Sequence, residues 1–162
     1  MNRSEDPHDL GAYVCLWFQE RAEEAARFYV DLIPGARIEQ IHAPPGQTEG
    51  VHYVDLWLGG NRYRLLNGGP YFTLNEAASI TLEPADQAQA DRLWNALIAD
   101  GGSPSQCGWC KDRFGLSWQV VPKEVMAWLQ GPQAKETLDA LLPMQRIDVE
   151  AVRAALEAAG RA

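Results

Sequence analysis

Two stretches of the chain repeat the same order of hydrophobic and polar positions. Residues 13–18 form a short apolar run, and residues 22–33 follow with apolar side chains spaced as on one face of a helix. Residues 78–82 and 87–99 show the same order, a short β-branched run and then an amphipathic helix. Short runs typical of strands follow each helix. The pattern predicts an α+β fold with two βαβββ modules, over residues 12–69 and 77–122.

Each predicted helix leads into strands that form a hairpin. The expected strands are 36–42, 51–58 and 62–67 in the first module, and 108–111 and 116–121 in the second. Glycine-containing turns are expected at residues 59–61 and 112–115. Because one helix cannot cover both faces of its sheet, we expect the two sheets to pack together and curve round a central cleft. The cleft is where function is expected.

The two ends of the chain differ from the modules. Residues 1–11 are polar and acidic and are predicted to be a frayed tail. Residues 123–162 carry three amphipathic segments without a chemical motif, so we predict a helical C-terminal extension with helices at 123–129, 133–142 and 148–159. These helices are expected to cover a sheet or to pair with a second subunit, and the remaining apolar surface predicts a homodimer.

Composition restricts the classes of partner. The 162 residues carry a net charge of −8 and a pI near 4.8, with Lys and Arg scattered singly. This argues against nucleic acid and anionic membranes as partners. No apolar run approaches the roughly 20 residues of a membrane span, and the first residues lack the apolar core of a signal peptide. With only three cysteines, the sequence predicts a soluble, cytoplasmic protein.

The chain holds few motifs that carry chemistry. Cys107 and Cys110 form a C-x-x-C pair, but a turn and a strand follow, whereas redox catalysis needs the first thiol at a helix N-terminus. We therefore expect a small buried thiol beside an exposed one. The three histidines, which lack metal-ligand spacing and are expected at the surface or on edge strands, are His8, His42 and His52. No phosphate-binding loop, Rossmann turn or nucleophile elbow is present.

Several strings occur in an order that resembles a known family. They are residues 15–18, 22–29, 66–70, 72–76, 106–109 and 111–122. Together they resemble the PhnB-like branch of the vicinal oxygen chelate superfamily, which includes glyoxalases, bleomycin resistance proteins and extradiol dioxygenases. Members of this branch often carry the description "3-demethylubiquinone-9 3-methyltransferase". The resemblance spans residues 13 to about 150 and implies the fold and its pocket.

The resemblance also indicates where a metal would be held. Enzymes of the superfamily hold a divalent ion with His or Glu from four strands. The equivalent positions in this chain are Tyr13, Ser79, Leu65 or Asn67, and Gln119. None supplies the carboxylate or imidazole that such an ion requires, so we expect no metal and no cofactor. Methyl transfer from S-adenosylmethionine would normally use a glycine-rich strand-to-helix turn in a doubly wound sheet, and the sequence offers neither.

The function expected from the resemblance is binding of a small apolar or aromatic molecule in a metal-free cleft. The expected lining residues, for each of which plain core packing is the alternative, are Trp17, Trp57, Asn67, Phe72, Ser79, Thr81, Trp109 and Gln119. Gln119 must point away from Trp118, and therefore into the cleft if Trp118 packs under a helix. The alternatives are an enzyme of the superfamily, either a glyoxalase-like lyase or isomerase or the methyltransferase of the description, and a structural or regulatory subunit.

Overall fold

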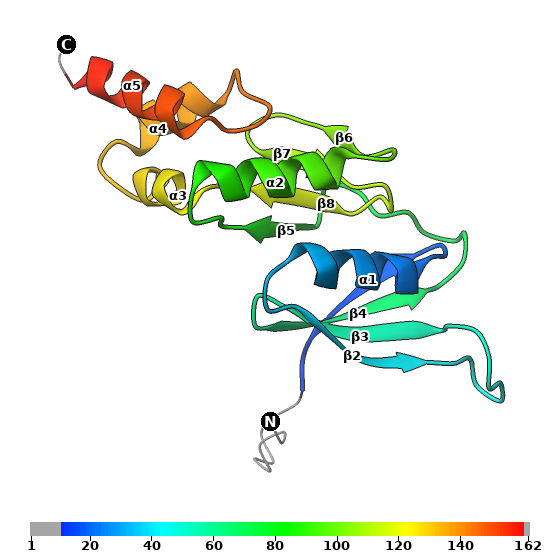
Figure 1. Cartoon of the computed structure of the whole chain (residues 1–162). Helices are drawn as coiled ribbons and strands as arrows, with labels where there is room; N and C mark the ends of the chain where they lie inside the picture. The colour runs from blue at the N-terminus through cyan, green and yellow to red at the C-terminus, as the bar shows by residue number, and fades with distance from the viewer. Residues whose placement is uncertain (1–10, 161–162) are drawn as a thin grey trace. The chain divides into compact units, whose positions relative to one another are not determined.

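A computed structural model describes residues 11–160, which divide after Thr73 into two compact units (Figure 1). Unit 1 is residues 11–73 and unit 2 is residues 74–160. The predicted N-terminal tail falls almost wholly on residues 1–10, outside the described part. Each unit contains one four-stranded mixed sheet, which confirms the α+β fold.

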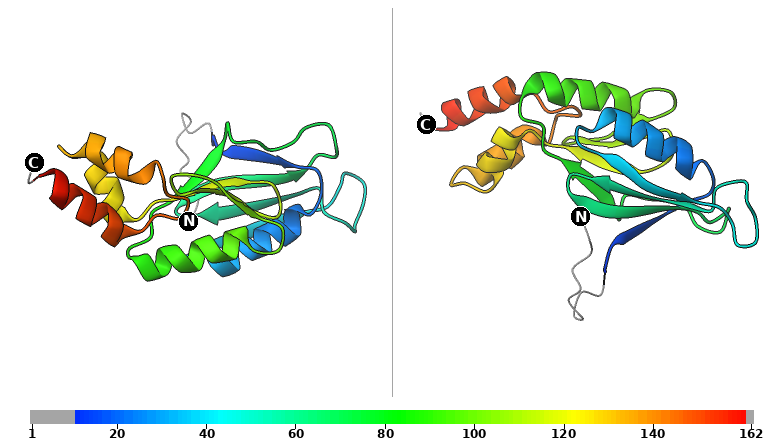
Figure 2. Two further views of the ribbon diagram at one scale, coloured as in Figure 1. Left: turned by 90° about the horizontal axis from the view of Figure 1, so that it is seen from above. Right: turned by 60° about the horizontal axis from the view of Figure 1, so that its bottom comes forward.

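Unit 1 is the first βαβββ module. Its elements are β1 (Val14–Phe18), α1 (Ala22–Leu32), β2 (Arg37–His42), β3 (Tyr53–Leu58) and β4 (Asn61–Asn67). The strands lie in the order β1-β4-β3-β2, with β1 parallel to β4 and the other pairs antiparallel. The crossover through α1 places the helix against one face of this sheet (Figure 2).

The face under α1 forms the core of unit 1. Ala25, Ala26 and Tyr29 of the helix are fully buried, as the predicted apolar stripe requires. The sheet meets them with alternate residues, because successive side chains of a strand point to opposite faces. Those buried sheet residues are Leu16, Phe18, Val54, Leu56, Leu58 and Leu65.

The β3–β4 hairpin is tighter than its sequence predicts. Leu58 pairs with Asn61, so the loop is the two residues Gly59 and Gly60 rather than residues 59–61. Both glycines have positive φ, 54° and 85°, as a type I′ hairpin turn requires. With a loop of two residues, Asp55 lies directly opposite Arg64.

Unit 2 contains the second module and the C-terminal helices. The module comprises β5 (Ser79–Leu82), α2 (Gln87–Ile98), β6 (Ser103–Pro104), β7 (Trp109–Lys111) and β8 (Ser117–Val120), with strand order β5-β8-β7-β6. Ser103–Pro104 is a two-residue edge strand that the sequence pattern did not locate. Trp118 is 0 % exposed, and its neighbours across the sheet, Ile80 and Cys110, are buried with it.

Three helices follow the second sheet, as predicted. They are α3 (Lys123–Leu129), α4 (Ala134–Leu141) and α5 (Val149–Ala159). Val125, Leu141, Val152 and Leu156 lie in a hydrophobic cluster that these helices share. Asp148 caps α5 by accepting a hydrogen bond from the Ala151 N–H. Among the described helices, none has both the length and the apolar character needed to cross a membrane.

Candidate functional site

The face of the unit 1 sheet opposite α1 carries two of that unit's candidate side chains, Trp17 and Trp57. We call it the helix-free face. It carries the alternate strand residues that do not point toward α1, namely Cys15, Trp17, Arg37, Gln40, His42, Tyr53, Asp55, Trp57, Arg62, Arg64 and Leu66. Tyr13, just before β1, contacts Arg62 and Arg64 on the same face. Trp17 and Trp57 are therefore on one face, as the predicted binding role requires.

Asp55 is the centre of this face. Its side chain accepts two hydrogen bonds from Arg64, from Nε to Oδ1 at 2.8 Å and from Nη2 to Oδ2 at 3.0 Å. Arg62 Nη2 donates to Oδ2 at 2.8 Å, and Arg62 Nε donates to Glu39 at 2.7 Å. Asp55 is only 2 % exposed, so its charge is compensated almost entirely by these two guanidinium groups.

Aromatic rings lie against the guanidinium groups. The Arg64 guanidinium carbon is 3.9 Å from the Tyr53 ring centroid and 5.1 Å from that of Tyr13. Arg62 lies 4.4 Å from the Tyr13 ring. Such cation–π contacts attract the guanidinium groups to the ring faces. Two further stacks extend the surface, Arg37 on Trp57 at 4.9 Å and His42 on Tyr53 at 4.1 Å.

The electrostatics of the face keep Asp55 ionised. Burial alone would raise the pKa of Asp55, but the hydrogen bonds and charge of Arg64, with the charge of Arg62, outweigh it and hold the pKa below its ordinary value. The hydrogen bond with Asp55 in turn raises the pKa of Arg64. Both groups are therefore charged at neutral pH.

The helix-free face also retains polar groups without a partner in the described chain. Arg62 Nη1 and His42 Nε2 are buried and have no hydrogen-bond partner. His42 Nε2 is 3.4 Å from Asp55 Oδ2, close enough for charge interaction but without hydrogen-bond geometry. Arg37 contacts Trp57 and, within residues 11–160, forms no ion pair.

Trp17 and Phe72 form a second aromatic contact in unit 1. Their rings meet edge to face with centroids 5.0 Å apart, and Phe72 is 65 % exposed. The indole N–H of Trp17 donates to the Gly69 carbonyl at 3.0 Å. A Cβ at Gly68 would overlap the Trp17 ring, so the close approach of this segment requires glycine.

Asn67 differs from its expected role. Its Oδ1 accepts from the Ala22 N–H at the start of α1, at 2.8 Å, and its Nδ2 donates to the Val51 carbonyl at 3.0 Å. Both ends of the amide are thus bonded to the unit's own backbone rather than free for a ligand. Asn67 positions α1 and the loop before β3.

We expect Asn67→Ala to lower the free energy of unfolding by about 1–3 kcal/mol, because two backbone groups lose their partner. Chemical denaturation of the full chain measures this loss. Asn67→Asp is the matched variant, since it keeps the acceptor for the Ala22 N–H and loses only the donor to Val51. An equal loss of unfolding free energy in the two variants would contradict the role of Asn67 Oδ1 in holding the N-terminus of α1.

In unit 2 the predicted residues share the face opposite α2. Ser79, Thr81, Trp109 and Gln119 occupy alternate positions in register across β5, β7 and β8. Gln119 points away from the buried Trp118, as predicted, and its Nε2 donates to Ser79 Oγ at 2.9 Å.

A small cavity adjoins this face of unit 2. Its volume is about 190 Å³, and the polar or aromatic residues that line it are Glu76, Ser103, Ser105, Trp109, Lys111 and Ser117. Lys111 Nζ lies 2.5 Å from Glu76 Oε1. The Ser117 hydroxyl is buried without a hydrogen-bond partner. Of the predicted residues, only Trp109 lines this cavity.

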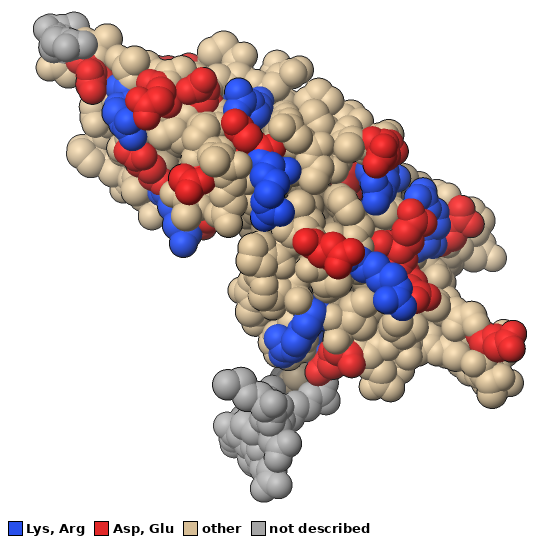
Figure 3. Space-filling view, in the orientation of Figure 1, with Lys and Arg blue, Asp and Glu red and all other residues tan. Residues whose placement is uncertain are grey.

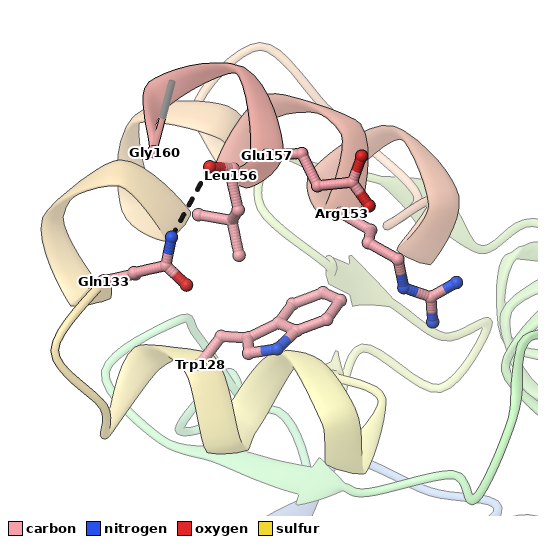
Figure 4. A pocket seen from close by; sticks show the side chains of 6 residues that line it. All are labelled: Trp128, Gln133, Arg153, Leu156, Glu157 and Gly160. Atoms are coloured by element: carbon pink, nitrogen blue, oxygen red, sulfur yellow. Dashed lines mark hydrogen bonds between the residues drawn. The ribbon is translucent and has the colours of Figure 1, made fainter. Parts of the chain in front are cut away.

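A second hollow, of about 440 Å³, lies between the C-terminal helices (Figure 4). Gln133 Nε2 donates to the Leu156 carbonyl across it, and the Arg153 guanidinium lies 5.9 Å from the Trp128 ring. Arg153 also binds Glu124 and Glu150. These contacts join α3, α4 and α5, so the lining groups already serve to hold the helices together.

Comparison with known proteins identifies the family. The family model described as 3-demethylubiquinone-9 3-methyltransferase matches residues 11–121. The chain belongs to this family. Its description is that of the PhnB-like branch that the sequence strings resemble. No curated protein sequence matches the chain. Residues beyond 121, which include α3–α5, lie outside the matched segment.

Solved structures show the same fold. A Bacillus cereus PhnB protein, described as a putative 3-demethylubiquinone-9 3-methyltransferase, is 24 % identical with a TM-score of 0.61. The match covers 68 % of this chain and 98 % of that one. A Pseudomonas aeruginosa protein is 25 % identical with a TM-score of 0.55, over 66 % of this chain and 92 % of that one.

The groups at the metal-ligand positions of this PhnB-like chain do not fit a divalent ion. Tyr13 lies beneath the guanidinium groups of Arg62 and Arg64, which repel a cation. The Gln119 amide is bonded to Ser79. Within residues 11–160, no three His, Cys, Asp or Glu side chains gather as ligands for a metal. These positions therefore do not suit metal-dependent chemistry.

The S-adenosylmethionine suggested by the family description fits no better. The connections from β1 to α1 and from β5 to α2, residues 19–21 and 83–86, contain no glycine. A glycine-rich turn in a doubly wound sheet is the usual way to bind this cofactor's class. Neither open sheet of the PhnB-like chain provides it.

The C-x-x-C pair has one buried thiol, as expected, but the other is half-buried rather than exposed. Cys110 is buried on β7, and burial, followed by the charge of Asp112, raises the pKa of its thiol to about 12. Cys107 is half-buried, with φ of 56°, and β7 rather than a helix follows it. A thiol protonated at neutral pH is a poor nucleophile, so the environment of Cys110 does not favour redox catalysis.

Proposed function

We propose that the protein binds a small aromatic or apolar molecule on the helix-free face of unit 1, without a metal ion. The observation that carries the proposal is the set of rings on that face. Trp17, Tyr53 and Trp57 lie there at alternate strand positions, with Tyr13 just before β1. Tyr13, Tyr53 and Trp57 each have a guanidinium group over the ring, and Trp17 meets Phe72 edge to face. Rigid rings held in this way offer large contact area at low entropic cost.

Two features support a small-molecule ligand over plain core packing. The face lies opposite α1, so the helix of its own unit does not cover it. It also combines rings with a few fixed polar groups, which is the usual composition of a small-molecule site. A core would instead exclude the ion pairs that Asp55 makes with Arg62 and Arg64.

The enzymatic alternatives have no specific support on this face. A glyoxalase-like lyase or isomerase needs a metal, and the donors described above do not fit one. The charge pattern of the surface does not favour nucleic acid, because acidic and basic side chains are interspersed on the face in Figure 3 and form no single basic patch.

Titration of the full chain with 2-naphthamide, a neutral aromatic probe, tests the proposal. We expect saturable quenching of tryptophan fluorescence that EDTA does not change. Trp57→Ala is expected to weaken binding about tenfold, which corresponds to about 1.4 kcal/mol.

Trp128→Ala is the matched control, because Trp128 lines the hollow between the C-terminal helices. This variant should bind the probe as the unmodified chain does. Absence of saturable binding, equal binding by Trp57→Ala, or binding that requires an added metal would each contradict the proposal.

A further inference from the structure

We propose that the ligand of the helix-free face is an organic acid, with its carboxylate bound by Arg37 and Arg62 beside the ring of Trp57. This inference rests on the proposed function and adds that the bound ligand is negatively charged. Its two arginines, Arg37 and Arg62, were not singled out by the sequence pattern.

The charges of the face are not balanced. Three guanidinium groups, those of Arg37, Arg62 and Arg64, meet two carboxylates, those of Asp55 and Glu39. The excess positive charge stands on a chain whose net charge is −8. Arg37, the guanidinium left without a carboxylate, is exposed and is therefore open to an anion from solvent.

Donors for an anion remain after the internal contacts are made. Asp55 engages two N–H groups of Arg64 and one of Arg62, and Glu39 engages another of Arg62. Arg62 Nη1 stays buried without a partner. Arg37 keeps its whole guanidinium, which can bind a planar carboxylate through two parallel hydrogen bonds.

The strand register places these groups in one row. Arg37 pairs with Trp57 across β2 and β3, and Trp57 pairs with Arg62 across β3 and β4. Two strand spacings put the Cα atoms of the arginines about 10 Å apart. The indole of Trp57 lies between them, so an aromatic ring can contact it while its carboxylate reaches a guanidinium on either side.

Glu39 shows that a carboxylate fits here. Its Oε2 accepts from Arg62 Nε at 2.7 Å, and its side chain is 41 % exposed. An exposed carboxylate in this position is weakly held, because solvent screens the pair. A ligand carboxylate can therefore replace it at small cost and also reach Arg37.

Calorimetric titration with two nearly isosteric probes tests the inference. We expect 2-naphthoate to bind the full chain at least tenfold more tightly than 2-naphthamide in about 20 mM salt. The preference should shrink at about 500 mM salt, because exposed guanidinium groups are screened. Arg37→Gln should bring the affinity for 2-naphthoate close to that for 2-naphthamide.

Arg27→Gln is the control for overall charge. Arg27 lies on α1 in a pair with Glu23, and its replacement removes the same charge from the helix side of unit 1. Because Arg37 forms no ion pair within the described chain, Arg37→Gln is expected to fold normally. Circular dichroism checks this before titration.

Every other outcome overturns either the organic-acid inference, its assignment to these residues, or the proposed function. Equal affinity for the two probes would overturn the organic-acid inference while the proposed function stands. A preference for 2-naphthoate that survives in Arg37→Gln, or that falls equally in Arg27→Gln, would overturn the assignment to this row. If neither probe binds, both the inference and the proposed function fail.

Discussion

Asp112→Ala is expected to lower the free energy of unfolding by about 3–5 kcal/mol, because each buried donor left without its charged acceptor costs about 1–3 kcal/mol. Asp112 is buried, and its Oδ1 accepts from the backbone N–H groups of Phe114 and Leu116 at 2.9 and 3.0 Å. Its Oδ2 accepts from the indole N–H of Trp118 at 2.8 Å. Urea denaturation followed by circular dichroism measures the loss.

A double-mutant cycle with Trp118→Phe separates the indole contact from the turn contacts. Phe removes the indole N–H, so the two losses should be less than additive by at least about 1 kcal/mol. Strict additivity would contradict a direct Asp112–Trp118 contribution. A loss below about 1 kcal/mol for Asp112→Ala would show that the turn does not depend on this carboxylate.

Asp55→Ala is expected to lower the free energy of unfolding by about 3 kcal/mol, because removing one partner of a buried pair leaves its cations uncompensated. Arg62 and Arg64 would remain beside one another and beside two tyrosine rings. This loss of free energy is at the lower end of the range for breaking a buried ion pair, because both arginine side chains keep some access to water. Asp31→Ala, at an exposed position of α1, is the control and should change little.

The Asp55 contribution should depend on pH in a defined direction. The pKa of Asp55 is lowered in the folded chain, so its stabilisation is complete above the ordinary unfolded pKa of about 3.9. It is lost as the pH falls through the lower, folded pKa. The free energies of unfolding of Asp55→Ala and the unmodified chain should therefore differ by a constant amount near neutral pH. The difference should disappear in acid. A difference in free energy of unfolding that stays unchanged from pH 7 into strong acid would contradict stabilisation by the ion pairs of Asp55.

The elements themselves could be predicted from the sequence because their periodicities are clear. Both sheet-forming runs and the apolar stripe of α1 lie where the pattern places them, and helix ends shift by only a residue or so. The two-residue strand Ser103–Pro104 was not predicted, because a run of two residues is too short to show alternation.

The cluster around Asp55 could not be predicted, for two reasons of register. A turn at residues 59–61 would pair Asp55 with Leu65, whereas the actual loop of Gly59 and Gly60 pairs it with Arg64. A shift of one residue changes every cross-strand neighbour. The tight Gly-Gly turn was the available signal for the correct pairing.

The second reason is an irregularity in β2. Its pairing with β3 shifts between Ile38 and Gln40. Arg37 and His42 are five residues apart, so simple alternation places them on opposite faces of the strand. The β-bulge brings both to the helix-free face. His42 does lie on an edge strand, as expected, but a single bulge leaves no mark on the apolar pattern, so its place beside Arg37 on the helix-free face was not predicted.

The C-terminal helices are an addition to the matched fold. They follow residue 121, where the family match ends, and they share a core that includes Val125 and Val152. Leu138 and Leu142 remain exposed at the end of α4. The homodimer expected from such surface stays a prediction.

The most direct test of ligand binding on the helix-free face is a two-dimensional ¹⁵N–¹H NMR titration of the tryptophan indoles with 2-naphthoate. We expect the indole resonances of Trp57 and Trp17 to shift in a saturable manner. Those of Trp94 and Trp118, which are buried in unit 2, should stay in place. A titration in which no indole of unit 1 shifts, or in which only Trp109 or Trp128 responds, would contradict binding on this face.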